Sequence, residues 1–254
     1  MKTIINTSYK DKEVAINQLV DDFFLKGKLI VQGSRNTIKS NFLDDENVNI
    51  KYFKKPGLLK SIIYSCFRNS KAKRSFEYAN YLLKFNINTP YPIAYIENRN
   101  QFGLLKDSYY LCKEINYDFT IRELIHDPLF DERQIILEQF TEFTFKMHEA
   151  NVNFLDHSPG NTLIVKKDKS IYDFYLIDLN RMKFQKMSIK DRMDNFKKMW
   201  LSKLMVKIIA NKYADLSNQN EFILQKILLK KATEFKTKIT KKKFYKRKLN
   251  LKND

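Results

Sequence analysis

The sequence has few of the residues that interrupt regular structure and few of those that bind soft metals. Only five glycines and five prolines occur among 254 residues, which excludes collagen-like and low-complexity chains. Three histidines and two cysteines, Cys66 and Cys112, are too few for a disulfide framework or for a zinc site of ordinary ligand spacing. This cysteine usage is typical of a protein in a reducing compartment.

Long hydrophobic runs are also absent. Residues 1–17 contain no apolar segment of signal-peptide length, and nowhere do about 18 uncharged apolar residues follow one another. We therefore expect a cytoplasmic protein that is neither exported by a signal peptide nor anchored by a membrane-spanning helix.

Apolar material for a folded core is plentiful. Hydrophobic residues make up 43% of the chain and aromatic residues 14%, which argues against disorder over most of its length. The chain exceeds the usual size of one domain, about 100–150 residues, but is too short for three. A two-lobed globular protein fits these limits.

The charge of the chain is strongly one-sided. Its 47 Lys and Arg oppose 29 Asp and Glu, and the net charge of +18 predicts an anionic partner. More than half of the excess lies after residue 225, where Glu234 and Asp254 are the only acidic residues. Apolar positions from Leu224 to Ile239 repeat at helical spacing, which predicts an amphipathic helix followed by a basic tail.

The first half of the chain has the pattern of a sheet with one helix. Residues 28–54 contain three strand-like runs separated by turn residues, which predicts an antiparallel meander. Residues 70–85 have helical periodicity, and two more strand-like runs follow at residues 92–98 and 107–115. The predicted order is βββαββ, with a sheet of about five strands.

The second half is mainly helical. A helix is predicted over residues 131–151, and a short hairpin over residues 162–179 follows an irregular segment. Ser188 and Asp191 resemble a capping box that begins a helix running through residue 208. The two halves together predict an α+β fold.

Five residues have the spacing and the predicted surroundings of phosphoryl-transfer chemistry. Asp156 and Asn161 form D-x-x-x-x-N, Asp178 follows the second strand of the hairpin, Lys51 lies on the third strand, and Glu77 lies on the next helix. In this chemistry a Lys and a helical Glu position the nucleotide phosphates, one Asp accepts a proton, and an Asn and a second Asp hold Mg²⁺. The order along the chain is that of a protein-kinase-like fold, with a small antiparallel β-sheet N-lobe and a mainly helical C-lobe.

Each of these residues alone also has a plain structural interpretation. In that interpretation, Lys51 is an outward-facing strand lysine and Glu77 is a carboxylate on a helix surface. Asp156 and Asn161 are then turn residues. Asp178 differs because it ends an apolar run, where a carboxylate is unfavourable without a partner such as a metal.

Three segments of the chain resemble the bacterial lipopolysaccharide-core kinases, the Kdo kinase and heptose kinase group of the protein-kinase-like superfamily. The segments are SKAKRSFEYANYLLKFNINTPYPIAYIE, FLDHSPGNTLIV and YLIDLNRMKF. The resemblance implies transfer of phosphate from ATP, with Mg²⁺, to a sugar hydroxyl of the inner core, with 3-deoxy-D-manno-octulosonic acid (Kdo) linked to lipid A as the expected acceptor. It further implies roles for five residues: Asp156 as catalytic base, Asn161 and Asp178 as metal ligands, Lys51 as phosphate contact and Glu77 as its partner.

Two parts of the protein-kinase pattern are missing. Phe154-Leu155 stands in place of the His-Arg pair of the catalytic loop, and neither G-x-G-x-x-G nor A-P-E occurs. Gly33 and Arg35 lie at the strand turn where the phosphate-covering loop is expected, so we expect them to contact the nucleotide.

The expected domain organisation follows this resemblance. Residues 1–109 form the N-lobe, residues 110–115 the hinge, residues 116–240 the C-lobe and residues 241–254 the basic tail. The tail is expected to hold the protein on the anionic inner face of the cytoplasmic membrane, where a lipid-linked acceptor lies.

Two other functions are open at this stage. A small-molecule phosphotransferase of the aminoglycoside or choline type would use the same Asp and Asn residues, but a basic protein would repel a cationic substrate. A non-catalytic nucleic-acid-binding protein would explain the charge, with Phe244 and Tyr245 stacking on bases, but it leaves the five residues unexplained. We expect no nucleic-acid partner.

Overall fold

The computed structural model describes the whole chain except residues 58–60, 62, 65–67 and 249–254. The chain has an α+β fold with antiparallel sheets and forms two compact units. Unit 1 comprises Met1–Asn116 and Asp178–Arg181, and unit 2 comprises Tyr117–Ile177 and Met182–Asp254.

A six-stranded antiparallel sheet forms the centre of unit 1, with the order β1-β5-β6-β4-β3-β2. Its strands are β1 (Lys2–Ile5), β2 (Lys28–Gln32), β3 (Asn36–Leu43), β4 (Glu46–Phe53), β5 (Pro92–Arg99) and β6 (Leu105–Lys113). The meander β2-β3-β4 and the strands β5 and β6 confirm the predicted order. The sixth strand, β1, is an addition that pairs with β5 far along the chain.

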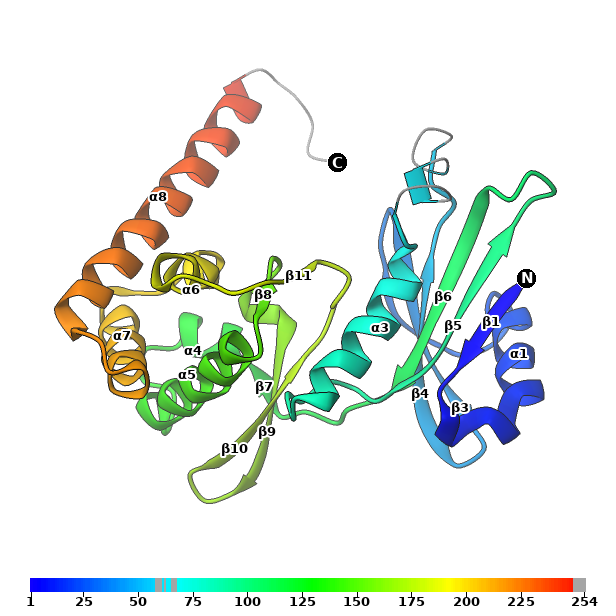
Figure 1. Cartoon of the computed structure of the whole chain (residues 1–254), viewed down its shortest axis with the longest axis horizontal. Coiled ribbons are helices and arrows are strands. Elements are labelled where there is room, and N and C mark those ends of the chain that lie inside the picture. The colour runs from blue at the N-terminus through cyan, green and yellow to red at the C-terminus, as the bar shows by residue number, and fades with distance from the viewer. Residues whose placement is uncertain (58–60, 62, 65–67, 249–254) are drawn as a thin grey trace. The chain divides into compact units, whose positions relative to one another are not determined.

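Two helices cover opposite faces of this sheet (Figure 1). Successive strand residues point to opposite faces, and in β6 Tyr109 and Leu111 pack in the cluster of α1 (Glu13–Asp21). Tyr110 and Cys112 pack instead with residues of α3 (Lys71–Lys84). A 3-10 turn, η1 (Thr7–Lys12), leads into α1. Cys112 is a buried free thiol, and Cys66 lies outside the described residues.

The same alternation decides where Lys51 points. Val48 and Ile50 of β4 are buried in the α1 cluster, whereas Phe53 is buried in the α3 cluster. Lys51 has the same parity as Phe53, and its Nζ lies 5.5 Å from the centre of the Phe53 ring. Lys51 is therefore on the α3 side of the sheet.

Unit 2 consists of helices around a buried apolar core, with short strand pairs at its edge. Its helices are α4 (Ile121–His126), α5 (Arg133–Glu149), α6 (Ile189–Asn195), α7 (Lys203–Ser217) and α8 (Glu221–Lys248), with 3-10 turns η2 (Pro159–Asn161) and η3 (Phe196–Met199). Its strands are β7 (Phe119–Thr120), β8 (Val152–Phe154), β9 (Thr162–Asp168), β10 (Ile171–Leu176) and β11 (Met182–Phe184). The β9-β10 hairpin confirms the prediction, and β9 also pairs with β7.

The single helix predicted from Ser188 through residue 208 is wrong. The Ser188 and Asp191 capping box does begin α6, but the chain leaves the helical conformation at Trp200, whose φ is 56°. Ser202 then accepts a hydrogen bond from the backbone N–H of Met205 and caps the new helix α7. A left-handed residue cannot continue a right-handed helix, so the segment divides in two.

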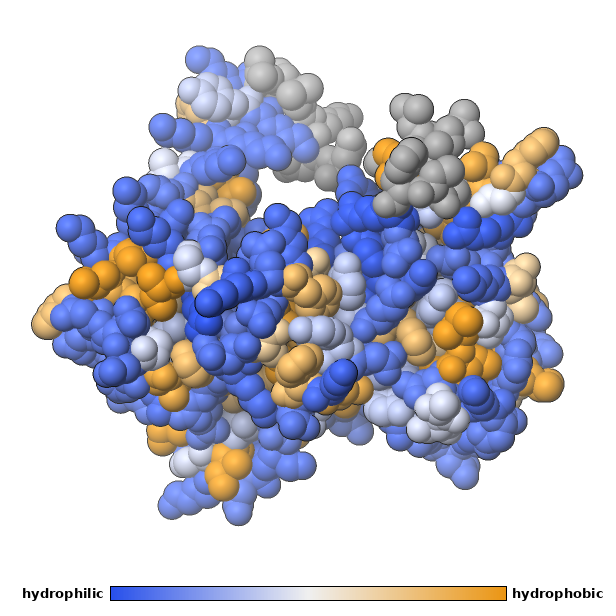
Figure 2. Space-filling view, in the orientation of Figure 1, coloured by the Kyte–Doolittle hydropathy of each residue, from blue (hydrophilic) through white to orange (hydrophobic). Residues whose placement is uncertain are grey.

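The long helix α8 has two different parts. Leu224, Leu228 and Ala232 are buried in unit 2, and Phe235 packs on Trp200 with ring centres 6.0 Å apart. The first part of the stripe is thus core rather than a free amphipathic face. Past residue 240 the helix continues to Lys248 with exposed side chains, and hydrophilic residues coat this part (Figure 2). Within the described residues, no helix is long and apolar enough to cross a membrane.

Candidate functional site

Lys51 and Asp178 form an ion pair within unit 1, although 127 positions separate them in the sequence. Lys51 Nζ lies 2.6 Å from Asp178 Oδ1, and Asn180 Nδ2 donates to the same oxygen at 2.7 Å. Asp178 follows the end of β10 and has a φ of 57°, in the left-handed region that few non-glycine residues occupy. Such conformations concentrate at functional sites.

A buried arginine of α3 fixes the short segment that carries Asp178. Arg74 is 5% exposed and donates through Nη1 to the backbone carbonyl of Asn180 at 2.7 Å. Burial lowers the pKa of Arg74 from its ordinary value. Arg74 therefore ties α3 to residues 178–181, and it was not among the residues singled out from the sequence.

Glu77 lies on α3 as predicted, but it does not contact Lys51. Its carboxylate accepts a hydrogen bond from Asn69 Nδ2 at 3.1 Å and lies 3.7 Å from Lys73 Nζ. Within the described residues, the ion pair predicted between Lys51 and Glu77 is not formed, because Lys51 is already paired with Asp178.

Gly33 and Arg35 lie at the turn between β2 and β3, where the sequence placed them. The Gly33 N–H donates to the Asn36 carbonyl at 2.8 Å, and Lys54 Nζ donates to the Gly33 carbonyl at 3.1 Å. A side chain at position 33 would come within 2.9 Å of Asn36 Oδ1, so the close turn favours glycine. Arg35 lines a cavity together with Lys71.

The loop that carries Asp156 lies in unit 2, and Asn161 and Lys198 both hold it. Asn161 Nδ2 donates to the backbone carbonyl of Asp156 at 2.8 Å, across the turn η2. Lys198 Nζ lies 2.9 Å from Asp156 Oδ1 and also donates to the Leu155 carbonyl at 2.6 Å. The D-x-x-x-x-N spacing therefore has a structural role, because the hydrogen bond from Asn161 to the backbone of Asp156 stabilises the loop between them. Lys198 is a contact that the sequence analysis missed.

Asn161 and Asp178 each offer oxygen atoms of the kind that Mg²⁺ prefers. Asn161 donates through Nδ2, which leaves its Oδ1 as an acceptor. Lys51 and Asn180 both contact Oδ1 of Asp178, and neither contact uses Oδ2. A carboxylate and an amide oxygen fit Mg²⁺ and do not suit a thiophilic metal.

Two buried histidines support the Asp156 loop from within unit 2. His157 Nδ1 lies 2.8 Å and His148 Nε2 lies 3.2 Å from Asn195 Oδ1. Since an amide oxygen only accepts, both of these ring nitrogens donate. Asn195 Nδ2 in turn donates to the carbonyl of Phe154 at 2.9 Å, next to the loop.

Burial keeps these two imidazoles uncharged. It lowers the pKa of His148 to about 3 and that of His157 to about 4. The His157 ring packs against Phe140, Phe154 and Phe196, so it points into the core and has no contact with solvent. Its role is to position the loop. The sequence showed only a histidine next to an aspartate, and this pattern does not distinguish a histidine that contacts substrate from one that positions the loop.

The comparisons with known proteins agree with this chemistry. The family model described as "Lipopolysaccharide kinase (Kdo/WaaP) family" matches residues 31–221, well over half of the chain. The chain belongs to this family. No curated protein sequence matches it. Among solved structures, it is similar to "WaaP in complex with acyl carrier protein" with a TM-score of 0.64 and 14% identity, over 92% of this chain and 99% of that chain.

Membership in the lipopolysaccharide kinase family confirms the resemblance seen in the sequence. The chain is a phosphotransferase with an alcohol group, a sugar hydroxyl, as acceptor, and a kinase family uses ATP as phosphate donor. The structural similarity, at its low identity, supports the fold alone.

Proposed function

We propose that this kinase transfers the γ-phosphate of ATP to a hydroxyl of Kdo linked to lipid A. The observation that carries the chemistry is the Lys51–Asp178 pair, because the fold joins two distant residues that the motif spacing assigns to the nucleotide phosphates and their metal. The match to the lipopolysaccharide kinase family supports the sugar acceptor.

The proposed architecture is a two-lobed protein-kinase-like fold. Residues 1–109 form the N-lobe, residues 110–115 the hinge, residues 116–240 the C-lobe and residues 241–254 the tail. The observed units support a division near these bounds, since unit 1 ends its first segment at Asn116. Helix α8 passes through the boundary at residue 240 without a break.

Asp156 is the proposed catalytic base. As the acceptor hydroxyl oxygen bonds to the γ-phosphorus, the bond from that phosphorus to the β,γ-bridging oxygen breaks and ADP leaves. The hydroxyl proton passes to the Asp156 carboxylate. Lys198 Nζ lies 2.9 Å from Oδ1 of this carboxylate, and the Asn161 contact holds the loop in place.

The remaining residues bind the nucleotide and its metal. Asn161 and Asp178 would hold Mg²⁺, which, when bound, neutralises charge on the phosphates. Lys51 would contact the phosphates. With Asp178 serving as a metal ligand, Glu77 would replace it as the ion-pair partner of Lys51. Gly33 and Arg35 complete the phosphate contacts from the β2-β3 turn.

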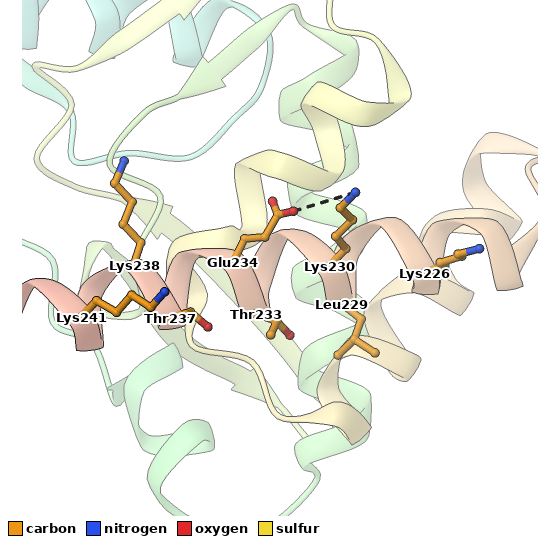
Figure 3. A pocket seen from close by; sticks show the side chains of 8 residues that line it. All are labelled: Lys226, Leu229, Lys230, Thr233, Glu234, Thr237, Lys238 and Lys241. Carbon is orange, nitrogen blue, oxygen red and sulfur yellow. Dashed lines mark ion pairs between the residues drawn. The ribbon is translucent and has the colours of Figure 1, made fainter.

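The distal part of α8 is proposed to hold the enzyme on the anionic inner face of the cytoplasmic membrane. Lys226, Lys230, Lys238 and Lys241 project from α8, and Glu234, the one acidic residue drawn with them, pairs with Lys230 at 4.0 Å (Figure 3). Beyond them, Phe244 and Tyr245 are 61% and 60% exposed. Exposed aromatics among lysines suit an anionic interface.

Incubation with labelled ATP, Mg²⁺ and a Kdo-bearing lipid A precursor tests the proposal. We expect a product heavier by one phosphate, with the label on the Kdo residue. Label on a heptose would support the kinase activity but show that heptose, and not Kdo, is the acceptor. Label on an aminoglycoside or choline instead, or oligonucleotide binding without phosphate transfer, would contradict the proposal.

A further inference from the structure

A cavity in unit 1 is lined mainly by cationic side chains. It lies between the β2-β3 turn, the chain after β4, the start of α3 and the start of β6, and its volume is about 330 Å³. Its charged lining residues are Arg35, Lys54, Lys55, Lys71, Arg181 and Asp107. Five cations thus oppose a single carboxylate. A volume near the lower end of ligand pockets, about 300–1,000 Å³, suits a group the size of one sugar.

Three of these five cations form no ion pair with the residues that the structure describes. Within the described residues, Arg35, Lys55 and Lys71 form no ion pair, and Lys54 donates only to the Gly33 carbonyl. The sequence explains this, because it contains no Asp or Glu between Glu46 and Glu77. Asp107 is engaged with Asn98 Nδ2 at 2.7 Å. At Arg35, Lys55 and Lys71 the cavity therefore carries positive charge that no ion pair with a described residue neutralises.

The start of α3 adds to this excess. A helix N-terminus carries partial positive charge and favours acidic residues in its first turn, yet α3 has none there. Its first four residues include Lys71, Lys73 and Arg74. Burial, and then the charge of Arg35, lower the pKa of Lys71. An anion in the cavity would offset the repulsion between Lys71 and Arg35.

The cavity lies next to Lys51 but does not include it. Lys51 Nζ and Lys71 Nζ lie 5.5 Å and 5.6 Å from the centre of the same Phe53 ring. Phe53 lines the cavity, whereas neither Lys51 nor Asp178 does. A charged group bound there would thus be close to Lys51 and Asp178 without taking their place, and would share Arg35 with the nucleotide phosphates.

We propose that this cavity binds an anionic group of the sugar acceptor, a carboxylate or a phosphate other than the one being transferred. The inference rests on the proposed function and deepens it, because it names the charge that the acceptor must carry. Lys71 and Lys55 are the specificity-determining residues. ATP is the other source of such a group, and the experiments separate the two sources.

The first experiment compares acceptor kinetics. Lys71→Gln and Lys55→Gln remove a cavity cation, and Lys84→Gln removes an exposed lysine from the far end of α3 as a control. We expect the two cavity variants to raise KM for a soluble Kdo glycoside about tenfold each, as for loss of one charged contact, with kcat within about threefold. The control should match the wild type.

A matching comparison removes the negative charge of the acceptor instead of the positive charge of the cavity. The methyl ester of the glycoside lacks the carboxylate, so the wild-type enzyme should show the raised KM, and Lys71→Gln should add little to it. Equal losses from Lys71→Gln with acid and with ester would exclude the carboxylate. The same comparison is then made with acceptors that carry or lack a phosphate. A loss from Lys71→Gln that depends on the phosphate would assign the cavity to that phosphate, and equal losses would overturn the proposal.

A second experiment does not depend on sugar phosphorylation. Inorganic phosphate should stabilise the wild-type protein against heat in the presence of a saturating non-hydrolysable ATP analogue and Mg²⁺, and should stabilise Lys71→Gln less. Competition between phosphate and the analogue would assign the cavity to ATP and overturn the proposal. Intact phosphate binding together with no transfer to any sugar would refute the proposed function and the acceptor assignment, but not the anion site.

Discussion

The Asp156 loop and the Lys51–Asp178 pair are held in place by different means. The loop is held by a hydrogen bond from Asn161 and by the buried network of His148, His157 and Asn195, and Asp156 itself pairs with Lys198. Asp178, which is 38% exposed, is held by Lys51 and Asn180. The loop is thus tied to the core as well as to a cation, whereas Asp178 depends on its two side-chain partners.

This difference indicates which region must rearrange when ligands bind. Asn195 joins both buried histidines to the backbone next to the loop, so the loop is preorganised for its proposed proton-accepting role. The Lys51–Asp178 pair is partly open to solvent, with Lys51 13% and Asp178 38% exposed, and Oδ2 of Asp178 takes part in neither the Lys51 nor the Asn180 contact, so a metal ion and phosphates can reach this carboxylate. The predictions below test the two regions, from the largest expected effect to the smallest.

Asp156→Asn should have the largest effect on activity. The amide keeps the shape of the side chain but cannot accept the proton, and a positioned general base contributes about 10²–10⁴-fold. We expect kcat to fall by that factor while ATP affinity, measured by equilibrium binding, is retained. Lys198→Gln is the companion variant, since it keeps the base and removes its 2.9 Å partner. Turnover of Asp156→Asn within a few-fold of the wild type would exclude the role.

Acid should destabilise the protein through the buried imidazoles. Burial lowers the pKa of His148 to about 3 and of His157 to about 4, whereas an unfolded histidine has a pKa of about 6.5. Between these values the unfolded state binds more protons. The free energy of unfolding therefore falls as the pH falls below about 6.5, by up to about 1.4 kcal/mol per pH unit for each imidazole, and is fully regained above it.

Denaturant unfolding between pH 7 and pH 5 measures this slope. His157→Gln should make the slope shallower, and His126→Gln, at an exposed position of α4, serves as the control. NMR titration of the imidazoles checks the same point without a variant. Protonation of His157 near pH 6.5 in the folded protein would show that the network is open to water.

The Lys51–Glu77 pair offers a smaller and more specific test of rearrangement. Lys51 contacts Asp178 and Glu77 contacts Lys73 in the structure, so the proposed pair forms only after Asp178 is engaged. We expect Lys51→Ala and Glu77→Gln to be non-additive in kcat/KM, with a coupling of about 0.5–3 kcal/mol, and additive in the free energy of unfolding of the apo protein. Full additivity in both measurements would show that the two residues never meet.

Local sequence patterns were sufficient for the elements that local signals determine. Ser70 accepts from the backbone N–H of Lys73 and begins α3 where predicted. Turn residues marked the β2-β3-β4 meander and the β9-β10 hairpin. The family resemblance was confirmed, because it rested on three segments with fixed spacing.

Long-range contacts were beyond these patterns. The strand β1 is four residues long and pairs with Glu97–Ala94 of β5, which no neighbouring residue signals. Asn195 joins two histidines that lie 47 and 38 positions before it. Lys51 contacts Asp178, which lies 127 positions later in the sequence, so the motif predicted a role for each residue but not this contact.

The smallest effect on the chemical step is expected from the end of α8. The buried stripe ends at Ala232 and Phe235, and the described residues past Thr240 are exposed except for the half-buried Lys246. Truncation after Thr240 removes seven Lys and Arg among 14 residues. We expect kcat for a soluble sugar acceptor to change little. Binding to anionic vesicles should weaken in low salt, and KM for a lipid-embedded acceptor should rise, because each Lys or Arg near such a surface contributes up to about 1 kcal/mol.

Charge variants decide whether position or net charge causes this effect. Replacing Lys241, Lys242 and Lys243 by Gln should reproduce most of the loss of vesicle binding. The same change at three exposed lysines of the β9-β10 hairpin, Lys166, Lys167 and Lys169, should reproduce little of it. Equal losses from both triple variants would mean that total charge attracts the protein to the membrane. Unchanged binding of the truncated chain would leave α8 with no role there, and its exposed lysines would then have to serve another partner.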